Sequence, residues 1–261
     1  MGASLRRLLN FTSEGETLVS TLDEAAGTTG LLIVSGGNEV RVGAHRGMAL
    51  LAARLAASGM PVFRFDRRGV GDSSGENGGY LSSAPDMAAA AAMFRREAPH
   101  IERLVGFGNC DAATALALFG RKAGVERLVL ANPWVVERPV DDLPPAAAIS
   151  ARYAERVRNP REWWRLLRGG VDMLKLMKGL RAVLGTRPEA ALARQVAAAL
   201  ADMDATIILA ARDATAIAYR DAAEAIGLVL PTVTVDTASH SFAREGDAAA
   251  LAAAIRAAIT R

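Results

Sequence analysis

The sequence predicts an α/β fold with a mostly parallel central sheet and helices on both faces. Short apolar runs alternate with amphipathic, alanine-rich segments along most of the chain, and this alternation is typical of βαβ units. The length of 261 residues suits one large domain, or one domain with an insertion. With 51% hydrophobic and 23% charged residues, the composition supports a sizeable core and argues against global disorder.

The expected elements follow from these runs in order. Residues 5–22 alternate around Gly15 and indicate a β-hairpin. The expected buried strands cover residues 30–35, 61–66, 103–107, 127–131, 206–210 and 232–235. The expected helices cover residues 43–58, 85–97, 111–123, 216–226 and 246–259. Right-handed crossovers then bring the carboxyl ends of the parallel strands to one edge of the sheet, where sites gather.

Residues 137–203 break this rhythm because they contain no convincing strand. We expect a helical cap there, inserted between the two parts of the core, residues 1–136 and 204–261, and lying over the site as a lid. Within it, residues 152–187 carry ten Lys or Arg against three Asp or Glu. This basic stretch is either a solvated helix face or a docking surface for an anionic substrate, a carrier protein or a membrane.

Composition narrows the function classes. The net charge is +3. The sequence lacks a dense run of basic residues interleaved with aromatic ones, so nucleic acid is not an expected partner. The single cysteine excludes an intramolecular disulfide and fits a reducing compartment. The sequence contains no run of about 18 uncharged apolar residues, so no membrane span is expected. No apolar signal segment follows Arg6-Arg7. We therefore expect a cytoplasmic protein; its oligomeric state is not indicated.

That single cysteine, Cys110, stands where a nucleophile is expected. An apolar strand at residues 103–107 leads into Gly108-Asn109-Cys110-Asp111-Ala112, and an alanine-rich helix follows. This strand–turn–helix context is that of the Gly-x-Ser-x-Gly nucleophile elbow of α/β-hydrolases, with sulfur in place of oxygen and alanine in the last position. The tight turn requires small flanking residues, and a helix N-terminus favours thiolate. Alternatively, Cys110 is a small buried residue that packs a strand end.

A cysteine nucleophile needs a base and an orienting acid, and the chain offers both in the order expected. His240 follows the last expected strand, and Asp213 follows the strand before it. The order Cys110, Asp213, His240 is the nucleophile–acid–base order of α/β-hydrolases. Asp236 is a weaker candidate for the acid. For the oxyanion hole we expect the N–H of Asp111 and a second N–H from Gly37 or Asn38.

Residues 64–75, Arg-Phe-Asp-Arg-Arg-Gly-Val-Gly-Asp-Ser-Ser-Gly, form a charged, glycine-rich loop after a strand. The loop lacks the Gly-Lys-Ser/Thr ending of a phosphate-binding loop. We expect a structural role, in which Asp and Arg side chains satisfy buried backbone groups of the loop.

Three segments together, residues 36–46, 64–75 and 108–113, resemble the exosortase A system-associated hydrolase 1 family. These α/β-hydrolases are encoded beside exopolysaccharide and protein-sorting genes in Gram-negative bacteria. The resemblance covers the core and implies an α/β-hydrolase fold, with no substrate implied because the family is named by genomic association. This chain departs from the family pattern at Asn38-Glu39, where an aromatic residue is usual.

Four further residues are candidates for substrate binding. His45 either packs the first helix or faces the substrate, and Arg46 could pair with an acidic group. Trp163 and Trp164 either line an acyl pocket or belong to the core of the cap.

The sequence thus predicts acyl transfer from a small ester, thioester or lactone to water, with neither a metal ion nor a cofactor. Two alternatives remain open: an acyltransferase with the same triad, and a catalytically silent binding or scaffold protein of an exopolysaccharide machine.

Overall fold

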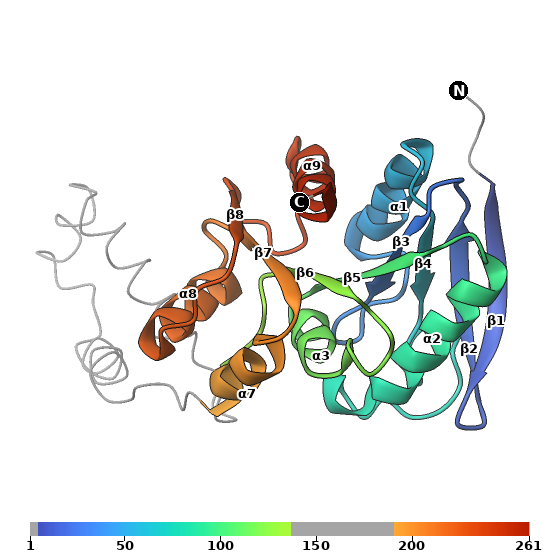
Figure 1. Ribbon diagram of the computed structural model, residues 1–261, viewed down its shortest axis with the longest axis horizontal. Helices are drawn as coiled ribbons and strands as arrows, with labels where there is room; N and C mark the ends of the chain where they lie inside the picture. The colour runs from blue at the N-terminus through green and yellow to red at the C-terminus, as the bar shows by residue number, and fades with distance from the viewer. Residues whose placement is uncertain (1–4, 137–190, 261) are drawn as a thin grey trace, which may run out of the picture.

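The computed structural model describes residues 5–136 and 191–260. Its strands form one eight-stranded sheet in the order β1-β2-β4-β3-β5-β6-β7-β8 (Figure 1). The strands are β1 (Arg6–Ser13), β2 (Glu16–Asp23), β3 (Thr29–Val34), β4 (Val62–Phe65), β5 (Arg103–Asn109), β6 (Arg127–Ala131), β7 (Asp204–Ala210) and β8 (Thr232–Val235). The helices are η1 (Ala44–Arg46), α1 (Gly47–Ala57), η2 (Tyr80–Ser82), α2 (Ala84–Glu97), α3 (Asp111–Phe119), α7 (Ala191–Leu200), α8 (Ala214–Ile226) and α9 (Asp247–Thr260).

The sheet is parallel from β4 to β8 and antiparallel only at its β1–β2 end. Strands β1 and β2 form the expected hairpin, closed by Glu14 (φ 48°) and Gly15 (φ 88°). Positive φ at both turn residues is the geometry that matches the twist of a two-residue hairpin. The predicted class, a mostly parallel sheet with helices on both faces, is confirmed.

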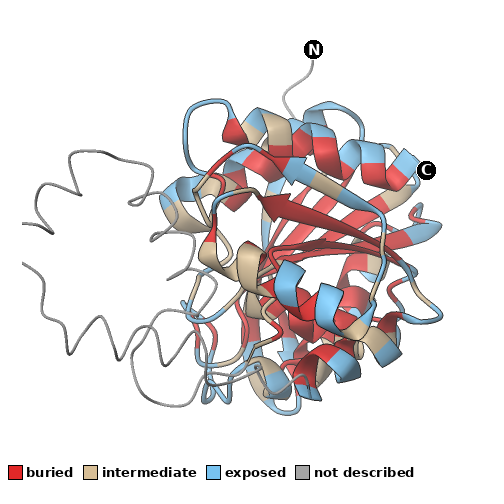
Figure 2. Ribbon diagram, turned by 90° about the vertical axis from the view of Figure 1, so that its left-hand side faces the viewer, coloured by how far each residue is buried: buried red, intermediate tan, exposed pale blue. Residues whose placement is uncertain are grey.

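The strands β3 to β7 bury both of their faces, which explains why they read as continuous apolar runs. On β3, Leu31 and Ile33 point into one core layer, while Leu32 and Val34 point into the other. Helices α1 and α9 cover the first layer, and α2, α3, α7 and α8 cover the second. Figure 2 shows the same division, with buried strands between helices whose outer surfaces are exposed.

Two expected helices are shorter than the sequence pattern suggested. The helix expected at residues 43–58 begins at Gly47, because His45 (φ 52°) and Arg46 (φ 61°) adopt left-handed backbone conformations. The helix expected at residues 111–123 ends at Phe119 and continues as a hydrogen-bonded turn to Gly124 (φ 78°). In both places local backbone geometry overrides a helical pattern of side chains.

Of the range expected to form the cap, residues 137–190 lie outside the described residues. The rest contains α7, which packs against α3 and α8. Its apolar side chains Leu192, Val196 and Leu200 are buried in the core layer on that face of the sheet. The described part of this range therefore belongs to the layer of helices that covers the sheet.

Candidate active site

Cys110 lies at the sharp turn between β5 and α3. Its φ of 62° is unusual for a residue with a side chain, and such strained positions cluster at functional sites. The turn is held against β6, because the Cys110 N–H donates to the Ala131 carbonyl (3.0 Å) and the Trp134 N–H donates to the Cys110 carbonyl (3.2 Å). A Cβ on Gly108 would lie 2.8 Å from the Ala112 carbonyl carbon. The close approach of the backbone at Ala112 thus leaves no room for a side chain at Gly108.

The structure brings Asp213 and His240 together beyond the ends of β7 and β8. His240 Nδ1 lies 3.0 Å from Asp213 Oδ2. The same carboxylate oxygen accepts the N–H groups of Thr215 (3.1 Å) and Ala216 (3.0 Å), so Asp213 also caps α8. Asp236, the other candidate for the acid, is exposed and forms an ion pair with Arg212 instead.

The surroundings of His240 strongly favour its protonated form. The hydrogen bond to Asp213 raises the pKa of His240 to about 10, helped by a hydrogen bond between the ring and Cys110 and opposed by burial. Burial alone would raise the pKa of Asp213, but the bond from His240, its charge and the two backbone N–H groups of α8 lower it. Because Nδ1 faces the carboxylate, Nε2 is the ring nitrogen left for the sulfur.

The groups expected to form an oxyanion hole lie together, with one complication. The Gly37 N–H donates to both carboxylate oxygens of Asp111, at 2.8 and 3.0 Å. Within the described part of the chain, the N–H groups of Asp111 and Asn38 have no acceptor. A Cβ on Gly36 would lie 2.5 Å from Asp111 Oδ1, so only glycine leaves room for this carboxylate. Gly37 can therefore serve an acyl oxygen only after the Asp111 side chain moves.

The charged loop after β4 has a structural role, as expected, but the side chains of Asp66 and Arg67 bind backbone groups of residues 37–41 and not of the loop itself. Buried Asp66 accepts the backbone N–H and the guanidinium of Arg41. Ser73 Oγ donates to the Asp66 carbonyl (2.8 Å) and accepts the Val19 N–H (3.0 Å). Arg67, almost fully buried, donates from Nη2 to the Gly37 carbonyl (2.5 Å) and lies 3.8 Å from Asp111 Oδ2. This loop thereby supports the Gly36-Gly37 turn beside the elbow.

None of the four residues expected to bind substrate is placed beside Cys110 by the described structure. His45 and Arg46 are exposed at the strained entry to α1, after the carboxyl end of β3. Trp163 and Trp164 lie outside the described residues. Sequence reasoning missed Asn109 and Asn132, whose side-chain amides both donate to the His240 carbonyl. A polar residue that ends an otherwise apolar strand was the signal that could have found Asn109.

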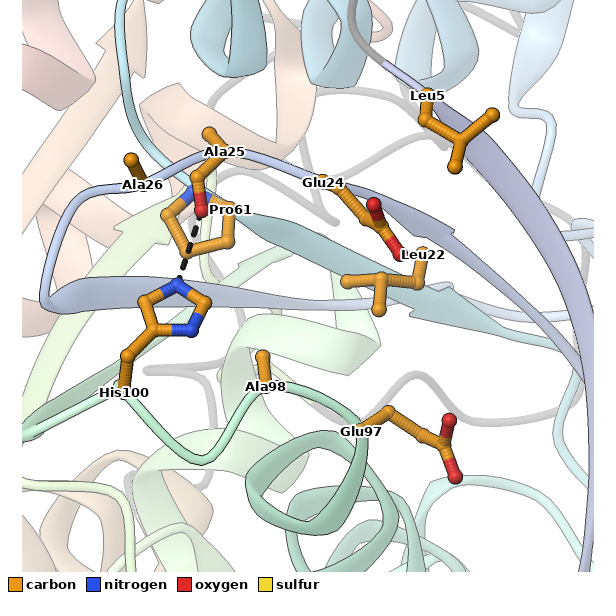
Figure 3. Close-up of a pocket in the computed structure, with 9 residues that line it drawn as sticks. All are labelled: Leu5, Leu22, Glu24, Ala25, Ala26, Pro61, Glu97, Ala98 and His100. Atoms are coloured by element: carbon orange, nitrogen blue, oxygen red, sulfur yellow. Dashed lines mark hydrogen bonds between the residues drawn. The ribbon is translucent and has the colours of Figure 1, made fainter.

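A separate pocket lies away from these residues, at the opposite edge of the sheet (Figure 3). It is lined by Leu22, Glu24, Pro61 and Ala98, with His100 Nε2 2.9 Å from the Ala25 carbonyl. Among residues 5–136 and 191–260, no group of three or more potential metal ligands gathers. In the same residues, no helix is long and apolar enough to cross a membrane.

Comparisons with known proteins identify the fold. No family model matches the sequence, and no curated protein matches it significantly. Among solved structures, an esterase of Pyrococcus furiosus superposes with a TM-score of 0.63 at 15% identity, covering 99% of this chain and 91% of that one. A lidless α/β serine hydrolase of Xanthomonas campestris gives 0.60 at 14% identity, covering 98% and 94%. The thioesterase domain of the curacin biosynthetic pathway gives 0.57 at 15%, covering 98% and 100%. The chain has the α/β-hydrolase fold.

Proposed function

We propose that this protein is a hydrolase that cleaves an ester, thioester or lactone through a thioester acyl-enzyme on Cys110. The observation that carries the proposal is the 3.0 Å contact between His240 Nδ1 and Asp213 Oδ2, together with the interaction of the same ring with Cys110 at the β5–α3 turn. These three residues follow three different strands and meet at the carboxyl edge of the sheet, where α/β folds place their sites. The fold shared with esterases and a thioesterase domain is consistent with this chemistry.

The raised pKa of His240 defines the charge of the base. With a pKa of about 10, the imidazole is protonated at neutral pH. A neighbouring imidazolium favours the nucleophilic thiolate form of a cysteine, and in the proposed mechanism this form attacks. The thiolate attacks the acyl carbon, and a tetrahedral intermediate forms with its oxygen toward the N–H groups of Asp111 and Asn38. The intermediate collapses as the bond to the leaving group breaks and His240 Nε2 gives its proton to that group.

Hydrolysis of the acyl-enzyme reverses these roles. Neutral His240 takes a proton from water, the hydroxide adds to the thioester carbon, and the carbon–sulfur bond breaks to release the acid. The thiolate and the imidazolium are then restored, while Asp213 holds the ring through Nδ1 throughout. The tetrahedral intermediate expels a thiolate or an activated alkoxide more readily than an amine. We therefore place thioesters and lactones above amides as substrates.

We propose acylated saccharide intermediates as candidate biological substrates, because the family that the sequence resembles is encoded beside exopolysaccharide genes, although the resemblance itself implies no substrate. A carrier-bound thioester is one form that such an acyl group takes. The basic stretch at residues 152–187, which lies outside the described residues, is then the proposed contact for an acidic carrier.

The test is direct detection of the acyl-enzyme. The protein is mixed with acyl thioesters and aryl esters of graded chain length, quenched in acid and weighed by mass spectrometry. We expect a mass increase of one acyl group on the peptide that contains Cys110, with turnover of the substrate. Cys110→Ala and His240→Ala should abolish turnover. Added alcohols or amines distinguish hydrolysis from acyl transfer, because an acyltransferase would yield new esters or amides. Absence of both labelling and turnover across the series would overturn the proposal.

A further inference from the structure

We propose that Asn109 and Asn132 form an amide clamp that positions the catalytic base through the main-chain carbonyl of His240. This inference rests on the proposed function, which assigns the base to His240. It goes beyond that function because neither asparagine touches the reacting atoms. Both are positioning residues, and their side chains lie between the strand ends that carry the nucleophile and the acid.

The clamp consists of two donors that converge on one acceptor. Asn109 Nδ2 donates to the His240 carbonyl at 3.0 Å, and Asn132 Nδ2 donates to the same oxygen at 3.2 Å. A backbone carbonyl has two lone pairs, so these two bonds saturate it. Asn132 Nδ2 also donates to Asn109 Oδ1 at 3.0 Å, which fixes the two amides relative to each other.

Asn132 is built into the sheet rather than left at its surface. Its side chain is fully buried, its backbone has φ 40°, and its own N–H donates to the Ile208 carbonyl at 2.9 Å. Its Oδ1 accepts the Ala210 N–H at 2.8 Å. Asparagine tolerates positive φ better than most residues with a side chain. Both donor hydrogens and the acceptor of this buried amide are therefore used.

These contacts link all three members of the proposed triad. Asn109 is the last residue of β5 and directly precedes Cys110. Ala210 ends β7 shortly before Asp213. Asn132 follows β6, which lies between β5 and β7 in the sheet (Figure 1). One buried amide thus joins the strand end of the nucleophile, the strand end of the acid and the backbone of the base.

The loop that carries His240 needs such an anchor. It has no helix or strand between β8 and α9. Bonds of Thr237, Ser239 and Arg244 hold the loop on either side of His240. Among the described residues, the two asparagine amides are the hydrogen-bond partners of the His240 backbone itself. The imidazole must reach the Asp213 carboxylate and the sulfur at once, and small displacements of catalytic groups cost rate steeply. The clamp sets the peptide from which the ring projects.

The experiment compares Asn109→Ala and Asn132→Gly with the full-length wild type. Glycine at position 132 tolerates the positive φ, so this variant removes the amide without adding backbone strain. We expect kcat to fall about tenfold in each variant, while KM stays within about threefold, because the clamp orients the base rather than binding substrate. The double variant should lose less than the product of the two single losses, since both amides act on one oxygen.

A second measurement does not depend on turnover. The chain has only three histidines, so NMR can follow the titration of His240 with the other two rings as references. We expect the pKa of His240, raised to about 10 in the wild type, to fall in both variants as the bond to Asp213 loosens. This arm decides the inference even where the wild type turns over no substrate, an outcome that would defeat only the proposed function.

Ser20→Ala is the matched control for lost stability. Ser20 is fully buried on β2 and donates Oγ to the Leu9 carbonyl at 3.0 Å, far along the sheet from the triad. It should lower Tm without changing kcat or the titration of His240. The inference is overturned if the folded asparagine variants keep wild-type kcat and a wild-type titration of His240. It is equally overturned if their loss of kcat only matches that of Ser20→Ala at equal loss of Tm.

Discussion

His240 Nδ1 and Asp213 Oδ2 lie 3.0 Å apart although their residues are 27 positions apart in the chain. The carboxylate is held from its other side by two N–H groups at the start of α8. The helix that Asp213 caps therefore fixes the direction in which the imidazole is held. Asp213 thus serves both as the N-cap of α8 and as the partner of the His240 ring.

The activity of the proposed hydrolase should depend on pH through His240. Because its pKa is raised to about 10, the imidazolium that protonates the leaving group persists through neutral pH and is lost as the pH rises through that value. Asp213→Asn removes the largest cause of the shift while keeping a side chain that can cap α8. We expect the alkaline limb of kcat/KM to move toward the ordinary pKa of 6.5. Asp236→Asn should leave the profile unchanged; a shift there instead would move the acid to Asp236.

The same pair should make stability depend on pH, with opposite signs for its two members. The raised pKa of His240 means that its stabilising contribution is complete below pH 6.5 and is lost as the pH rises through about 10. The lowered pKa of Asp213 means that its contribution is complete above 3.8 and is lost as the pH falls below it. Urea unfolding of the wild type and Asp213→Asn should therefore differ most between these limits. A constant difference from pH 6 to about 10 would contradict this coupling.

The carboxylate of Asp111 should oppose catalysis in its present position. It accepts the Gly37 N–H beside Cys110, the proposed nucleophile, where negative charge would develop on the acyl oxygen. Two unit charges about 4 Å apart repel by about 4 kcal/mol at an effective dielectric constant of about 20, and nearby Arg67 offsets part of this. Asp111→Asn keeps the shape and removes the charge, so kcat/KM for neutral esters should rise about tenfold. Asp202→Asn, at an exposed site, controls for net charge; a fall in the Asp111 variant would show that the carboxylate assists the reaction.

Much of this site could be predicted because its residues follow strands that read clearly as apolar runs. Cys110, Asp213 and His240 each lie just past the end of β5, β7 or β8, so the strand pattern and the parallel topology together place them at one edge. The role of the loop after β4 was predictable for a similar reason, since Asp66 and Arg67 follow a buried strand and have backbone groups to satisfy.

What could not be predicted depends on backbone dihedrals and on contacts between distant segments. The left-handed conformations of His45 and Arg46 shorten α1 without any glycine at those two positions. The bond between Asp111 and Gly37 joins segments 74 positions apart, and no local pattern encodes it. Asn132 looks like an ordinary residue after a strand, and only the assembled sheet brings its amide to the His240 carbonyl.

Alanine substitution should have opposite effects on stability at Gly108, in the elbow, and at Gly47, which has free space around it. A Cβ on Gly108 would lie 2.8 Å from the backbone of Ala112, so Gly108→Ala must displace either β5 or α3. We expect a loss of about 1–3 kcal/mol in the free energy of unfolding, with loss of turnover. Gly47, the control, has helical dihedrals, and a Cβ added there would meet no atom within 4 Å. Gly47→Ala should be stabilising by about 0.4–1 kcal/mol; equal effects at the two sites in denaturant titrations would refute the close contact.

The buried ion pair between Arg64 and Asp23 should contribute far more to stability than the exposed pair between Arg212 and Asp236. Arg64 Nη2 lies 3.1 Å from Asp23 Oδ2, with side chains only 2% and 1% exposed. Burial lowers the pKa of Arg64, and the charge and hydrogen bond of Asp23 oppose this. Asp23→Asn leaves the buried Arg64 charge without its carboxylate and also breaks the ion pair of Asp23 with Arg6, so it should cost about 3–5 kcal/mol in the free energy of unfolding. Asp236→Asn breaks the exposed pair with Arg212, whose side chains are 56% and 83% exposed, and should cost less than about 1 kcal/mol. Similar losses for the two variants would mean that water reaches the Arg64 guanidinium and that β2 and β4 are not sealed against each other there.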